Sequence, residues 1–225
     1  MTELNSSWKT RSIAIGIGIA FMVLALILQS ITQAIPSLLI IFKYGTSRGT
    51  VALGNFELSN PIIWALFIGG TAAVYQESFK YFSVNTQSKY FAIWIGLGFA
   101  FVDVGVILFD LLFYRRAGAQ KTVLVLSMLN VVSSLLFHPG TALILKYGRT
   151  IERGFYFLLF TILLHGIEDG GLGFTDLYVL VHRSAYEKAI IIFWVVAMVV
   201  SITSFVLGMF FRRSLYAREM DEHPI

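Results

Sequence analysis

The sequence contains no cysteine and few charged residues. The absence of cysteine excludes disulfide bonds and thiolate chemistry. Charged residues make up 13% of the 225 residues, whereas soluble domains have about 25%. This deficit excludes an ordinary soluble domain. The formal net charge of +4 is spread over the segments between apolar runs. It suits contact with an anionic membrane surface and gives no support to nucleic-acid binding.

The sequence is instead rich in long apolar runs. Hydrophobic residues make up 57% of the chain, and the mean hydropathy is +0.77. The runs are continuous and do not alternate apolar with polar residues, which favours helices over a barrel. We predict an all-α fold: a polytopic membrane helix bundle of about six transmembrane helices, with five to eight possible. The whole chain, residues 1–225, is predicted to be a single integral membrane domain. The predicted spans are residues 12–33, 61–84, 91–113, 123–146, 154–172 and 189–211.

The first apolar run and the segments between the spans predict how the chain is arranged in the membrane. The first run is too long for the core of a signal peptide, so we predict a retained first span. Residues 35–42 are predicted either to continue that span beyond a kink at Pro36 or to form an interfacial helix. Residues 43–60 and 173–188 are predicted as loops, and the residues after 211 as a frayed, solvated tail. Nine lysines and arginines lie on the side of the termini and seven on the other, which predicts cytoplasmic termini.

Ionisable residues inside the predicted spans mark a candidate site. A charge at the centre of a membrane helix costs roughly 2.5 to 3.5 kcal/mol on insertion scales. At 1.5 Å of rise per residue, four of these residues lie about 10 to 18 Å from the side of the termini, although successive spans alternate in direction. This common depth predicts one cavity with mutual side-chain distances within about 10 Å. The residues inside the spans are Glu77, Asp103, His138, His165 and Asp169.

His165 and Asp169 lie four residues apart and therefore share one helix face. An imidazole and a carboxylate in this arrangement can bind a metal ion. They can equally stabilise an oxyanion or relay a proton. The simpler alternative is a carboxylate that only orients a core histidine.

Glu77 is followed three residues later by Lys80 on the same helix face. We interpret Glu77 as a general base that Lys80 holds in place. The alternative is an intrahelical ion pair with Lys80 extending to the membrane surface. His138 precedes Pro139 and Gly140, which predicts a kinked or opened helix beside the imidazole. A lone membrane histidine can also be a hydrogen-bonding residue between helices.

The same residues fall in four short motifs that resemble those of the PrsW-like and YhfC-like intramembrane metalloproteases. That group belongs to a superfamily with the CAAX-prenyl proteases, the bacteriocin-processing enzymes and the Aph scaffold subunit of gamma-secretase. The resemblance covers about residues 72–171, and Gln76 and Asp103 depart from the family pattern. The motifs read Gln76-Glu77-x-x-Lys80 for Glu-Glu-x-x-Arg/Lys, Phe99-x-x-x-Asp103 for Phe/His-x-x-x-Glu/His, a central His138, and His165-x-x-x-Asp169 for His-x-x-x-Asp/Asn.

The resemblance implies an intramembrane peptidase with a four-helix catalytic core over about residues 61–172. Its substrate would be a membrane-embedded or membrane-proximal protein, and its location the plasma membrane of a prokaryote. Glu77 would be the general base on water, with Lys80 and Asp103 in support. The catalytic residues would be Glu77, His138, His165 and Asp169. His138, His165, Asp169 and Asp103 would bind a divalent metal, zinc above all, or polarise the scissile carbonyl without one.

Two alternatives remain open. The Aph-type members show that this fold can persist as a non-catalytic membrane scaffold. A small ion-coupled transporter also lines its helices with acids and histidines. Against a transporter, the sequence has no internal repeat, and the candidate residues share one depth where a transport path would cross the membrane.

Overall fold

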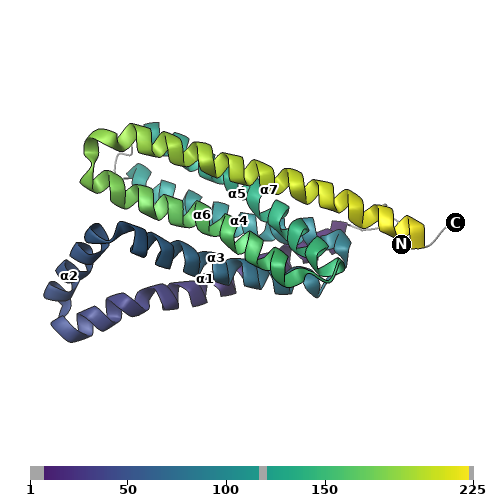
Figure 1. Ribbon diagram of the computed structural model, residues 1–225, viewed down its shortest axis with the longest axis horizontal. Coiled ribbons are helices and arrows are strands. Elements are labelled where there is room, and N and C mark those ends of the chain that lie inside the picture. Colours follow the sequence, from purple (N-terminus) through teal and green to yellow (C-terminus); the bar gives the residue numbers. More distant parts are fainter. Residues whose placement is uncertain (1–7, 117–120, 223–225) are drawn as a thin grey trace. The chain divides into compact units, whose positions relative to one another are not determined.

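The computed structural model describes residues 8–116 and 121–222, and within these ranges the chain is helical and has no β-strand. The predicted all-α fold is confirmed. The described residues form α1 (Trp8–Tyr44), α2 (Thr46–Ser59), α3 (Pro61–Asn85), α4 (Ala92–Arg116), α5 (Lys121–Thr150), α6 (Gly154–Val181) and α7 (Tyr186–Glu222) (Figure 1). Two short 3-10 helices, Lys89–Phe91 and Arg183–Ala185, precede α4 and α7.

The helices identify an integral membrane protein. Among the described residues, five helical stretches are long and apolar enough to cross a membrane, and α2 with α3 form a sixth if this bent pair is one span. The axes of α2 and α3 differ by 99°. Large apolar side chains such as Leu38, Phe109 and Ile192 are exposed on the helices, as lipid-facing residues are. The five stretches are Trp8–Tyr44, Lys89–Phe113, Leu124–Thr150, Gly154–Val181 and Arg183–Leu215.

The prediction of a loop over residues 43–60 is wrong. Helix α1 continues through Pro36 to Tyr44, and α2 occupies most of the remaining segment. The chain turns at Gly45, whose φ of 74° is a conformation that residues with a side chain rarely adopt. The polar residues of this segment therefore lie on a short helix that follows a glycine turn.

The predictions of a loop over residues 173–188 and of a frayed tail after residue 211 are also wrong. Helix α6 extends to Val181, α7 begins at Tyr186, and α7 continues to Glu222. Helix α5 likewise runs through Pro139, so the helix does not open beside His138, and the alternative of a kink there stays a prediction. Polar residues mark where a helix leaves the hydrocarbon, and they do not by themselves end the helix.

The described residues divide into two compact units. The first unit comprises residues 8–23, 78–161 and 198–222 within the described ranges, and the second comprises residues 24–77 and 162–197. In the first unit, Gly96 of α4 packs on α5, since a Cβ on Gly96 would lie 2.7 Å from the carbonyl oxygen of His138. Such close approach needs a residue without a side chain.

Candidate functional site

Helices α3 and α6 approach each other closely within the second unit. A Cβ on Gly69 would collide with the backbone of Gly170, and a Cβ on Gly166 would lie 3.9 Å from that of Ala73. Residue numbers rise along α3 as they fall along α6, so the two helices are antiparallel here. Small residues at this seam let the backbones come close enough for polar side chains of the two helices to meet.

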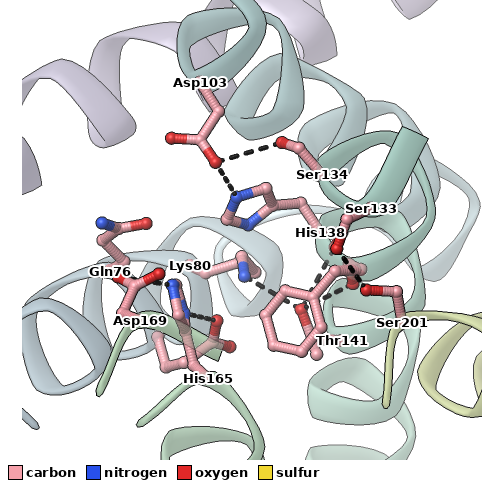
Figure 2. A network of polar contacts seen from close by, with 12 residues as sticks. Gln76, Lys80, Asp103, Ser133, Ser134, His138, Thr141, His165, Asp169 and Ser201 are labelled. Atoms are coloured by element: carbon pink, nitrogen blue, oxygen red, sulfur yellow. Dashed lines mark hydrogen bonds and ion pairs between the residues drawn. The ribbon is translucent and has the colours of Figure 1, made fainter. Parts of the chain in front are cut away.

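Glu77, His165 and Asp169 form a chain of contacts beside this seam. Glu77 Oε1 lies 2.7 Å from His165 Nδ1, and His165 Nε2 lies 3.4 Å from Asp169 Oδ2. Figure 2 shows the contact between His165 and Asp169. The structure thus brings together three of the predicted catalytic residues. Because both imidazole nitrogens face carboxylates, the ring can accept a proton on one side and release one on the other.

The three side chains differ in accessibility. The Glu77 side chain is 0% exposed and that of His165 is 4% exposed, whereas 37% of the Asp169 side chain is exposed. A buried carboxylate costs several kcal/mol unless a hydrogen-bonded partner compensates it, and His165 is such a partner for Glu77. Of these three side chains, Asp169 is therefore the one that water or a substrate reaches first.

A row of neutral polar side chains joins α1 to α3 in the second unit, and sequence reasoning missed it. Gln76 Nε2 donates to Gln29 Oε1 at 3.0 Å, and the Thr32 and Tyr75 hydroxyls are 2.9 Å apart. Gln33 donates to a main-chain oxygen of α3 at 2.9 Å. Positions 29, 32 and 33 share one helix face, a spacing that could have identified the row. Gln76, which departs from the family motif, is held in place by these contacts.

Asp103 and His138 meet in the first unit. His138 Nε2 lies 3.0 Å from Asp103 Oδ2, and the Ser134 hydroxyl donates to the same oxygen at 3.1 Å (Figure 2). His138 is buried, whereas the Asp103 side chain is 31% exposed. The carboxylate therefore fixes the orientation of the imidazole and still reaches the surface of its unit. Sequence reasoning found Asp103 and His138 but not Ser134.

Lys80 is fully buried in the first unit. Its ammonium donates to the Thr141 hydroxyl at 2.9 Å (Figure 2). The same ammonium lies 5.4 Å from the ring centres of both Phe99 and Phe137. Two aromatic faces and a hydroxyl compensate part of the cost of burying this charge. The alternative in which Lys80 extends to the membrane surface is therefore wrong. Asp103 and Lys80 lie in the first unit and Glu77 in the second, so the predicted convergence on one cavity stays a prediction.

The donor set does not fit a metal site as it is arranged. Among the described residues, no group of three or more His, Cys, Asp or Glu side chains is placed to hold a metal ion. Both nitrogens of His165 already contact carboxylates, so the ring would have to release one of them to bind a metal. The predicted zinc stays a prediction.

Comparisons of the chain with protein-family models, with curated proteins and with solved structures find no match. The resemblance to the PrsW-like group therefore stays a prediction that depends on the four motifs.

Proposed function

We propose that the protein is an intramembrane hydrolase that cleaves peptide bonds of membrane-associated protein substrates. The contact chain of Glu77, His165 and Asp169 supports this proposal most directly. An imidazole between two carboxylates is costly to bury in mostly apolar helices, and it is suited to moving protons.

In the proposed reaction, a water molecule at the Asp169 end of the chain attacks the carbonyl carbon of the scissile peptide. The pair of Glu77 and His165 takes one proton from that water as the new C–O bond forms. The same proton then goes to the leaving nitrogen as the C–N bond breaks, so the products are a carboxylic acid and an amine. Glu77 stabilises the charged imidazole, and Asp169 holds the ring in place. The roles of His138 and Asp103 stay those that the resemblance implies.

The proposal includes a location. The apolar helices support a membrane protein, and we place it in the plasma membrane of a prokaryote with both termini in the cytoplasm. The excess of lysine and arginine on the side of the termini supports that orientation. The substrate would then be a protein embedded in, or lying against, the same bilayer.

Hydrolysis in ¹⁸O-labelled water tests the proposal without a known substrate. Purified protein in liposomes would be incubated with a panel of single-span membrane peptides, and the products analysed by mass spectrometry. We expect new carboxyl termini that carry ¹⁸O with the wild type and none with His165→Ala. Labelled products in equal amounts from both proteins, or from neither, would contradict the proposal.

A proton-coupled carrier is the second candidate. The increase in solvent exposure from Glu77 through His165 to Asp169 favours it. Three titratable groups in contact lead from the sealed Glu77 to the exposed Asp169, as in a proton relay. A carrier predicts proton flux in liposomes that contain a pH-sensitive dye, with the flux lost in Asp169→Asn. If the protein shows neither hydrolysis nor proton flux, the non-catalytic scaffold becomes the interpretation.

A further inference from the structure

A groove at the turn between α6 and α7 has no role in the proposed reaction. It lies within the second unit and has a volume of about 680 Å³, which is in the range of small-molecule sites. The turn falls in the segment 173–188, which the sequence marks by its concentration of aromatic and charged residues. The groove is lined by Val179, Leu180, Arg183, Ser184, Tyr186, Glu187 and Lys188.

The groove lies where two membrane-spanning stretches end. One apolar stretch ends at Val181 and the next begins at Arg183. Aromatic rings follow each other along the last turns of α6: Tyr178 stacks on Phe174 with centres 5.7 Å apart, and its ring centre lies 4.5 Å from that of His182. Aromatic side chains with a polar edge concentrate at the level of the lipid headgroups. The groove is therefore open at the depth where headgroups lie.

The charges of the lining suit a phosphodiester. Arg183 and Lys188 carry two positive charges and Glu187 one negative charge, so the lining has a net charge of +1. One anionic phosphodiester would neutralise this charge. A guanidinium binds two phosphate oxygens at once, and the Ser184 hydroxyl is an additional donor. The apolar side chains of Val179 and Leu180 would contact the glycerol backbone and the first carbons of the acyl chains.

We propose that this groove, the α6–α7 headgroup site, binds the headgroup of an anionic phospholipid. A zwitterionic lipid would leave the positive charge of the lining uncompensated and would bind more weakly. A free phosphate has the same charge but would leave the apolar part of the lining uncovered. The proposal does not depend on hydrolysis or on proton transport.

Lipid binding to the purified protein in detergent tests the proposal. The dissociation constant for phosphatidylglycerol would be measured by native mass spectrometry for the wild type and for the double variant Arg183→Ala/Lys188→Ala. Each cation that lines the groove should contribute roughly a fivefold factor to the attraction of an anionic headgroup, the magnitude known for cations close to anionic lipid. We therefore expect binding about 25-fold weaker in the double variant. The matched control is Lys43→Ala/Arg48→Ala, which removes the same charge from exposed positions outside the groove and should bind like the wild type.

Several outcomes would overturn the proposal. They are equal affinity of the wild type and Arg183→Ala/Lys188→Ala, equal binding of phosphatidylglycerol and phosphatidylcholine, and displacement of the lipid by millimolar inorganic phosphate. The last result would identify a site for free phosphate. If the alanine variant does not fold, Arg183→Gln/Lys188→Gln takes its place with the same expected loss. The charge-conserving variant Arg183→Lys/Lys188→Arg should keep most of the affinity, and its failure to bind would also overturn the proposal.

Discussion

The Thr141 hydroxyl contacts a charge that is buried inside a membrane protein, so its removal should be costly. Thr141→Val keeps the shape of the side chain but leaves the Lys80 ammonium without the acceptor 2.9 Å away. We expect the free energy of unfolding to fall by about 1 to 3 kcal/mol, as for a lost hydrogen bond to a charged group. Unfolding in detergent, followed by circular dichroism, measures this change.

Thr150→Val is the matched control for that measurement. Thr150 is exposed, and its hydroxyl donates only to a main-chain oxygen one turn earlier in α5. The same chemical change should there alter the free energy of unfolding by less than about 0.5 kcal/mol. Equal destabilisation by both variants would show that the contact with Lys80 contributes no more to the free energy of unfolding than an exposed hydroxyl does.

At the scale of residues, the sequence predicts the charged members of the site better than the neutral ones. Glu77, His165 and Asp169 stand out because an ionisable side chain is expensive within a membrane helix, and the structure brings them together. Gln29 and Ser134 were missed because neutral polar residues are common between membrane helices. Only the partner of such a residue shows that it belongs to a site, and the partner lies far away in the sequence.

At the scale of elements, the seam between α3 and α6 positions Glu77 against His165. Gly69→Ala should destabilise the protein by about 1 to 3 kcal/mol, as overpacking does, because the new methyl would collide with the backbone of Gly170. Gly70→Ala is the control in the next position, where an added Cβ meets nothing within 4 Å. Alanine favours a helix over glycine by up to about 1 kcal/mol, so Gly70→Ala should keep or raise the melting temperature. A higher melting temperature for Gly69→Ala than for Gly70→Ala would contradict the close packing of α3 against α6 at Gly69.

The ends of the elements were the least predictable part of the fold. Apolar runs set where a helix crosses the hydrocarbon, and the central parts of the predicted spans are helical in the structure. The runs do not set where hydrogen bonding ends. Helices α1, α6 and α7 therefore continue past the apolar residues, and α2 forms in a segment that polarity alone marks as a loop.

At the scale of the whole molecule, the cysteine-free sequence allows a direct test of topology. Ser88 precedes α4 and Ser184 follows α6, and both are exposed. Three candidate spans lie between them. A membrane-impermeant maleimide should therefore label Ser88→Cys from the cytoplasm and Ser184→Cys from the opposite side. Labelling of both cysteines from one side would mean that α4, α5 or α6 does not cross the membrane. Cytoplasmic labelling of Ser184→Cys alone would show that the orientation is the opposite of the predicted one.

The most direct test of the proposed function is the rate at which Glu77→Gln cleaves a membrane peptide that the wild type hydrolyses. The substitution keeps the size of the side chain and removes the negative charge that stabilises the protonated imidazole of His165, so the rate should fall by about 10²-fold or more. Asp110→Asn is the control, because it removes a carboxylate from an exposed position of α4 outside the contact chain, and its rate should equal that of the wild type. Equal rates for the wild type and Glu77→Gln would contradict the assignment of Glu77 as part of the base.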